Sequence, residues 1–349
     1  MKRIKHQLRS VVILVIMLSI ILSSIPVYAS ELDETTIIKQ SVLSFAELFS
    51  DKQLAISKMI PIINLEQELI GYSVCLESNE IEYGYVNYEF DKENPITDFS
   101  IGEGNVYLDE SAEIAHETVL VSMGKGSYEL LATSANNSYT AYSSLEAIFS
   151  KNYIYSATVL TAPKYTSKYS SAKSLLSEEY ITRLTGKYAC TVVALTEIAY
   201  QEGILYNGSL RSTFDKLWND TLTSVAYVKN AFSYGSTMRM NEIYGMKDYL
   251  NDMGKGNSVV TSQTFPQFKF FQDIVDSNAS GTLTYTLYKT DGNTDSHTVS
   301  VVGYCSVMLN GVIYNYLIVA DGWHDDAPRY VAYNRVDFVN TSGVKYVIK

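Results

Sequence analysis

Cys190 is the residue best suited to chemistry, in the stretch Gly186 to Gln201 that reads GKYACTVVALTEIAYQ. Apolar residues after Cys190 cover most of the circumference of a predicted helix, so we expect that helix to be buried. A thiol in the first turn lies beside backbone N–H groups and the positive end of the helix dipole, which favour thiolate over thiol. The pattern indicates a candidate nucleophile, although a free cysteine is often a small buried hydrophobic residue.

A cysteine nucleophile needs a base for its proton, and the base needs a third group that fixes its tautomer. His297 begins the strand-like run SHTVSVVGYC, whereas His324 lies in the polar sequence WHDDAP. Because a strand end is a rigid position, His297 is the better candidate base. Asp321 ends the apolar run YLIVAD directly before Gly322 and Trp323. A carboxylate there is placed to accept a hydrogen bond from an imidazole.

The elements that must position these residues show two periodicities. Helical spacing is found in residues 31–57 and 190–203 and in three later segments near 214–218, 240–254 and 266–277. Short β-rich runs fill residues 59–99, and strand patterns return from Gly281 onward with a hairpin turn at Asn310-Gly311. These patterns predict an α+β protein with antiparallel strands.

The length of 349 residues suits two domains, or one domain with a long extension. Residues 1–29 have a basic start, an apolar run and a Val-Tyr-Ala ending, which together predict a signal peptide and a secreted or cell-surface protein. The apolar run is shorter than the ~20 residues of a membrane helix, so a retained anchor is the weaker interpretation. We expect no stable membrane insertion after signal removal. A polar, tyrosine-rich stretch between about 135 and 170 predicts the junction between domains 30–160 and 161–349.

The composition argues against nucleic acid as a partner and against a structural zinc site. The net charge is −11 and no cluster of Lys and Arg occurs, which argues against nucleic acid. Three widely separated cysteines without a CxxC pair argue against a structural zinc site. Among these cysteines, Cys75 and Cys305 are predicted to be strand residues. The sequence around His116 indicates no role for this histidine.

One stretch has the start of a calcium-loop pattern. Asp291, Asn293 and Asp295 alternate as in such a loop, but Ser296 occupies the position that requires glycine and no glutamate closes the loop. A plain turn is therefore predicted, and the sequence implies no metal and no cofactor.

A cysteine at a helix start, then HTVSVVGY, then IVADGW, in this order, is similar to papain-like cysteine peptidases of the bacterial C39-like or streptopain-like kind. The resemblance implies a papain-like catalytic domain over 161–349, in which a central helix carrying the cysteine packs on an antiparallel sheet. It also implies that Cys190 is the nucleophile, that His297 is general base and acid, and that Asp321 orients the histidine, where many relatives use asparagine.

The N-terminal half contains GYVNYEF followed by PITDFS, which resembles the propeptides of secreted zymogens. The resemblance implies a small α+β propeptide-like domain over 30–160 that packs on the catalytic domain. A permanent accessory domain is the alternative. One departure from the family is the stretch SEEYITRLTGKYAC, which has no glutamine where relatives usually place one to help hold the oxyanion.

The expected function is that of a secreted cysteine peptidase, a thiol protease made as a zymogen, which hydrolyses protein or peptide substrates through a thioester acyl-enzyme. Two alternatives remain open. The same triad would serve a transglutaminase-like crosslinker or a cell-wall amidase. The missing glutamine would suit an inactive papain-like domain that binds a partner.

Overall fold

The structure is a computed structural model that describes residues 34–90, 92–104, 118–122, 128–132, 153–169, 176–288, 293–322, 328–333 and 341–349. The chain divides into two units, Met1–Ile37 and Ile38–Lys349, and the description below concerns the second. The predicted signal peptide lies outside the described residues, as do His116, Asp291, Trp323, His324 and the Ser- and Asn-rich part of the predicted junction.

Helices and strands are both well represented in the described residues. The helices are α2 (Glu34–Ala46), α4 (Glu178–Thr185), α5 (Cys190–Gln201), α6 (Leu210–Asp220), α7 (Arg239–Asp252) and α8 (Phe268–Asp276). The strands are β1 (Ala55–Ile63), β2 (Leu69–Ser78), β3 (Ile81–Glu89), β4 (Ile96–Ile101), β5 (Thr118–Ser122), β6 (Tyr128–Ala132), β7 (Ala157–Tyr165), β8 (Lys187–Tyr188), β9 (Ser224–Lys229), β10 (Phe232–Ser236), β11 (Val259–Thr264), β12 (Ser280–Tyr288), β13 (Thr294–Leu309), β14 (Val312–Ala320), β15 (Arg329–Ala332) and β16 (Ser342–Val347). The predicted mixed α+β class is confirmed.

Most strands belong to one sheet, with the order β11-β16-β12-β13-β14-β15-β4-β3-β2-β1-β5-β6. The long strand β13 pairs along one edge with β12 and then with β7, and along the other edge with β14, always antiparallel. Strands β8, β10 and β9 form a separate small sheet. The candidate base lies near the start of β13 and the candidate orienting residue directly follows β14, so the β13–β14 pair brings these two residues together.

One sheet and one core contain residues from both sides of the predicted domain junction. Strand β4 pairs with β15, with Phe99 opposite Tyr330. The same buried cluster joins side chains of α2, β2, β3 and β4 to side chains of β13, β14 and β15. The strand β7 itself spans residue 160. The division at residue 160 stays a prediction, and the structure adds that the segments on its two sides share a hydrophobic core.

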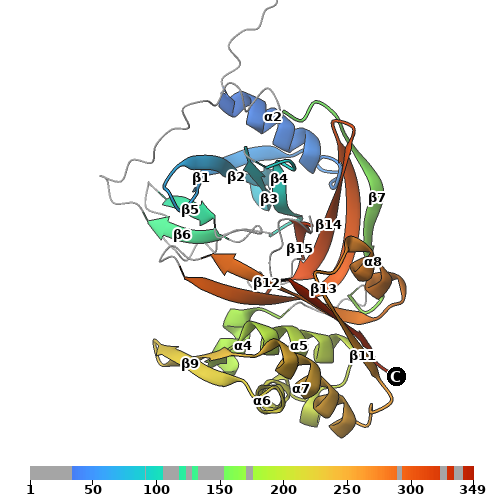
Figure 1. Cartoon of the computed structure of the whole chain (residues 1–349). Coiled ribbons are helices and arrows are strands. Elements are labelled where there is room, and N and C mark those ends of the chain that lie inside the picture. Colours follow the sequence, from blue (N-terminus) through green and yellow to red (C-terminus); the bar gives the residue numbers. More distant parts are fainter. Residues whose placement is uncertain are drawn as a thin grey trace, which may run out of the picture. The chain divides into compact units, whose positions relative to one another are not determined.

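Helices cover both faces of the C-terminal strands. Figure 1 shows α4 to α7 gathered beside β12 and β13, while α8 lies against β13 apart from them. Successive residues of a strand point to opposite faces. Accordingly Thr282 donates to the carboxylate of Glu242 in α7 over 2.5 Å, while the neighbouring Leu283 packs in the core beneath α8. The buried face of α5 therefore meets a different side of the sheet from α8.

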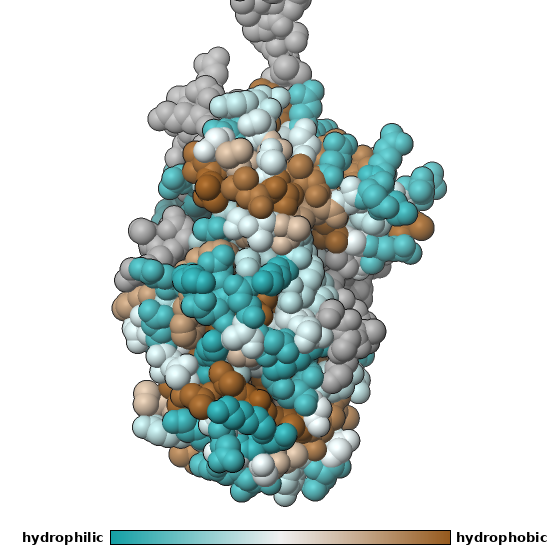
Figure 2. All heavy atoms as spheres, turned by 90° about the vertical axis from the view of Figure 1, so that its right-hand side faces the viewer, coloured by the Kyte–Doolittle hydropathy of each residue, from teal (hydrophilic) through white to brown (hydrophobic). Residues whose placement is uncertain are grey.

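Some large apolar side chains are exposed at the surface. Figure 2 shows two hydrophobic bands on one face, the upper where Figure 1 places α2 and β7 and the lower near α7 and β11. Strand side chains such as Leu160, Val259 and Ile313 are exposed. In the part of the chain that the structure describes, no helix is both long enough and apolar enough to cross a membrane.

Local predictions were mostly right in type and less accurate in extent. The Asn310-Gly311 turn is confirmed, since both residues have positive φ (51° and 85°) between β13 and β14. The helix predicted over 31–57 ends at Ala46, and strand β1 already begins at Ala55. Strands β8, β9 and β10 were not predicted. They form a small sheet whose outer strand is exposed at every position, so no burial pattern marks it in the sequence.

Candidate functional site

Cys190 begins helix α5, as the sequence predicts. The preceding Ala189 is extended (φ −159°, ψ 115°) and provides no side-chain cap for the helix. Strand β8 fixes the chain just before it, because Lys187 and Tyr188 pair with Ser233 and Tyr234 of β10. The N–H groups in the first turn of α5 therefore have no capping side chain from Ala189. They lie beside Cys190, where they can stabilise negative charge.

Helix α5 is buried along nearly its whole length, which fixes the position of the partly exposed thiol. Its first turn contacts the start of β13. The Cys190 Sγ donates to the main-chain oxygen of Ser296 over 3.7 Å, and the hydroxyls of Thr191 and Thr298 are 3.0 Å apart. The structure thus brings the thiol to the residue that directly precedes His297, although 106 positions separate cysteine and serine.

His297 is buried, with 2% of its surface exposed, and its ring is bound to Asp321. The Nε2 atom lies 3.1 Å from the main-chain oxygen of Asp321. A carbonyl oxygen can only accept, so Nε2 carries the hydrogen in the neutral ring and Nδ1 is the basic nitrogen. The ring also packs edge-on against Tyr285, with centroids 5.7 Å apart. These contacts fix both the orientation and the tautomer of the imidazole.

Burial sets the protonation state of this histidine. Desolvation lowers the pKa of His297 from 6.5 to about 4, and the nearby Asp321 opposes this only in part. The imidazole is therefore neutral at pH 6 to 8. A neutral imidazole can accept a proton from a thiol, but the lowered pKa also makes this histidine a weaker base than one with an ordinary pKa.

The same burial predicts an acid-sensitive fold. The folded-state pKa of His297 lies below its unfolded value, so the unfolded state binds the extra proton between pH 6.5 and about 4. Stability is complete above pH 6.5 and decreases as the pH falls toward 4, by about 3 kcal/mol in total. Urea denaturation of the wild type and of His297→Gln at pH 7.0, 5.5 and 4.5 measures this. A difference between the two proteins that stays constant over this range would contradict the expectation.

Asp321 directly follows β14, and the positive φ of the next residue, Gly322 (80°), turns the chain away from the strand. Its carboxylate is buried and lies 3.4 Å from the guanidinium of Arg329. The sequence predicts that this side chain accepts a hydrogen bond from the imidazole, whereas the hydrogen bond of His297 is to the main-chain oxygen of Asp321. The Arg329 guanidinium also binds Asp98 over 2.7 Å, and neither residue was singled out from the sequence.

A narrow space beside α5 is lined by Cys190 and Asp321 but not by His297. Its lining consists of Leu176, Cys190, Val193, Ala194, Glu197, Thr298, Ala320, Asp321 and Gly322. Thr298 and His297 are successive strand residues, so their side chains project from opposite faces of β13. The His297 side chain therefore lies on the face of β13 opposite to Thr298, beside Tyr285, and the contact of the Cys190 thiol is with the main chain of Ser296.

The other two cysteines lie in the strands predicted for them, where Cys75 is half-buried and Cys305 is buried. Burial raises the pKa of Cys75 to about 11 and that of Cys305 to about 12. Both are protonated at neutral pH, which makes them poor nucleophiles. Among the described residues, no group of three or more His, Cys, Asp or Glu side chains could hold a metal ion.

Arg329 and Asp98 are the members of this site that sequence reasoning missed. The only signal was a charged residue within each of the short strands β4 and β15, which is common in any sequence. Comparison of the sequence with known protein families and with curated proteins gave no match.

Proposed function

We propose that this protein is a secreted cysteine peptidase of papain-like type, in which Cys190 is the nucleophile, His297 the general base and acid, and Asp321 the residue that orients His297. The observation that carries the proposal is the convergence of α5, β13 and the end of β14. The Cys190 thiol reaches the residue before His297 over 3.7 Å, and the His297 ring donates to Asp321 over 3.1 Å.

The supporting architecture is a buried helix that presents a cysteine to an antiparallel sheet. Helix α5 packs against β13 and β12, and β12, β13 and β14 are mutually antiparallel. This resembles the arrangement expected for a papain-like domain. Secretion and synthesis as a zymogen remain predictions from residues 1–29 and from the propeptide-like sequence of the N-terminal half.

In the proposed reaction Nδ1 of His297 removes the thiol proton and the thiolate attacks the carbonyl carbon of a peptide bond. The main-chain N–H of Cys190 and the positive end of α5 stabilise the oxyanion, which partly replaces the missing glutamine. The tetrahedral intermediate collapses to a thioester as His297 gives its proton to the leaving amine. Water, deprotonated by His297, then hydrolyses the thioester to release the acid and restore the thiol.

Alkylation of the purified chain without residues 1–29 tests the nucleophile. We expect iodoacetamide at pH 6 to label Cys190 selectively, because burial keeps the pKa of Cys75 near 11 and that of Cys305 near 12. Peptide mass spectrometry locates the label. The matched control is Cys75→Ser, which should label at the wild-type rate, whereas Cys190→Ala should take up no label.

The dependence on His297 decides between an activated thiol and an ordinary one. An ordinary thiol with a pKa of about 8.5 is almost entirely protonated at pH 6 and reacts slowly. Labelling of Cys190 that is slow at pH 6 and unchanged in His297→Ala would refute the proposal and favour the binding-domain alternative. If labelling is fast, incorporation of an amine into protein or release of peptide from purified cell wall would identify the crosslinking or amidase alternative.

A further inference from the structure

Three buried charges join the N-terminal half of the chain to the proposed site. The side chains of Arg329 and Asp98 are fully buried and that of Asp321 is 1% exposed. One guanidinium nitrogen lies 2.7 Å from Asp98 and the other lies 3.4 Å from Asp321. The amide of Asn87 donates to both oxygens of Asp98, over 2.9 and 3.1 Å. The guanidinium is thus held between a carboxylate of β4 and the residue that accepts from His297.

A buried ion pair is weak evidence for a role in stability, because removing the charges from water costs about as much as their attraction returns. Its better-supported effect is to fix one arrangement of the groups around it. Here the group that is fixed is Asp321, whose main-chain oxygen determines the tautomer of His297. Outer hydrogen-bond partners of this kind orient functional histidines.

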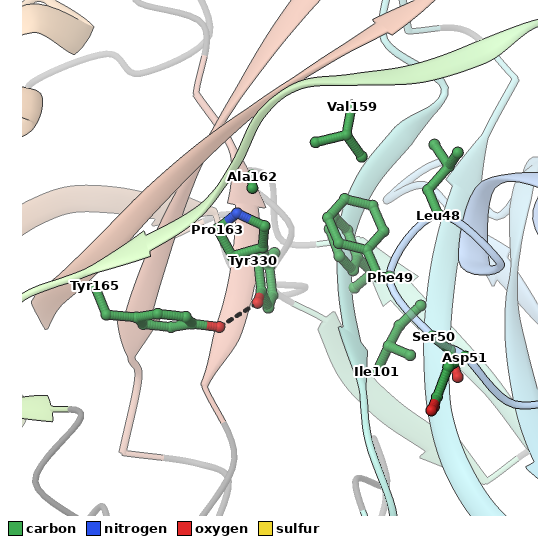
Figure 3. Close-up of a pocket in the computed structure, with 11 residues that line it drawn as sticks. Leu48, Phe49, Ser50, Asp51, Ile101, Val159, Ala162, Pro163, Tyr165 and Tyr330 are labelled. Carbon is green, nitrogen blue, oxygen red and sulfur yellow. Dashed lines mark hydrogen bonds between the residues drawn. The ribbon is translucent and has the colours of Figure 1, made fainter.

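The opposite face of β15 is also covered by the N-terminal half. Tyr330 follows Arg329 in β15, and its ring stacks on Phe99 with centroids 4.5 Å apart and 16° between the planes. Figure 3 shows Tyr330 hydrogen bonded to Tyr165, with Phe49 and Ile101 nearby in the lining of an open pocket. Residues on both faces of β15 therefore have partners that precede residue 102.

We infer that Arg329 is a positioning residue of the site, held by Asp98, and that residues 38–101 stay with the working enzyme as an integral part of it. The inference rests on the proposed function. It selects the permanent accessory region over the removable propeptide for these residues. Removal of β4 would leave the guanidinium of Arg329 with a single carboxylate and would expose the Tyr330 ring.

Substitutions at the two ends of the ion pair should act in opposite directions on His297. The groups that act on the imidazole are Asp321 and Asp295, which raise its pKa, and Arg329, which lowers it; the Tyr285 ring and the chain beside Cys190 complete its surroundings. Arg329→Gln removes a cation and should raise the pKa of His297. Asp98→Asn leaves the positive charge of Arg329 less neutralised and should lower the pKa of His297. Because this charge effect has opposite signs in the two variants, slower labelling of Cys190 in both would reflect displacement of the base and not its pKa.

The experiment uses the full chain after signal removal. NMR titration of the imidazole, assigned with His297→Gln, follows the pKa, and iodoacetamide labelling at pH 7 follows Cys190. We expect both variants to label about 10- to 100-fold more slowly, because a small displacement of the base has effects of this size. Asp273→Asn, which breaks an exposed ion pair with Lys269, is the matched control and should match the wild type.

The double variant Asp98→Asn/Arg329→Gln replaces the buried ion pair by amides. It can be used in the same titration and labelling experiments if a single variant does not fold. It should raise the pKa of His297, as Arg329→Gln does. The mass of the labelled wild-type species under native conditions should include residues 38–101, even if the chain is cut after them.

Each part of the inference can fail separately from the proposed function. A labelled species without residues 38–101, or variants that label at the wild-type rate with an unchanged His297 pKa, would overturn the inference and leave the peptidase proposal intact. A wild type whose Cys190 does not label would overturn the peptidase proposal.

Discussion

Replacing His297 with alanine is expected to lower hydrolysis of a fluorescent unfolded protein such as labelled casein by about 10⁴-fold or more, because the thiol then has no base. Asp321→Asn should cost much less, about 10-fold. The atom that accepts from the His297 ring is the main-chain oxygen of residue 321, and it remains in the variant. The kcat/KM value of each variant, divided by that of the wild type, measures the difference.

This comparison separates two ways of orienting the histidine. If the carboxylate oxygen were the acceptor during catalysis, Asp321→Asn would retain an amide oxygen while Asp321→Ala would retain none. Asp321→Ala should therefore behave like Asp321→Asn if the main chain is the acceptor. A loss in Asp321→Ala as large as that in His297→Ala would show that the side chain is needed.

Replacing Arg329 with methionine should produce the largest loss of stability. Removing one partner of a buried ion pair leaves an uncompensated buried charge and lowers the free energy of unfolding by about 3–5 kcal/mol. Here two carboxylates, those of Asp98 and Asp321, lose their common counter-ion. Urea denaturation at pH 7 measures the effect.

An exposed ion pair provides the control for this measurement. Lys269 is 67% exposed and binds Asp273 one helical turn away, so Lys269→Met should change the free energy of unfolding far less than Arg329→Met does. Equal effects of Arg329→Met and Lys269→Met would mean that the pair with Asp98 is not buried in solution. The urea m-value should stay constant if both variants unfold in one step.

Local patterns were enough to predict the individual elements of the site. The apolar run after Cys190 is helix α5, the alternating run after His297 is strand β13, and Asp321 follows β14. Each of these depends on neighbours within a few positions, through helical or strand periodicity. The predicted burial of α5 follows from the same pattern and is confirmed.

Contacts between distant strands were not predictable in this way. The pairing of β4 with β15 joins residues 231 positions apart, and it is this pairing that brings Asp98 to Arg329. Strand pairing depends on tertiary packing, and nothing in either short strand identifies its partner. The domain boundary predicted at residue 160 relied on polar composition. Composition does not show that side chains from both halves of the chain pack in one core.

The sequence by itself determined the type of the elements and the candidate nucleophile, base and orienting residue. These follow from residue type and spacing. Only the tertiary structure decided which atom of Asp321 binds the imidazole, that His297 is buried enough to have a pKa of about 4, and that an arginine and an aspartate join the site. Desolvation and ion pairing act between groups that are distant in the chain and near in space, so only the folded arrangement sets them.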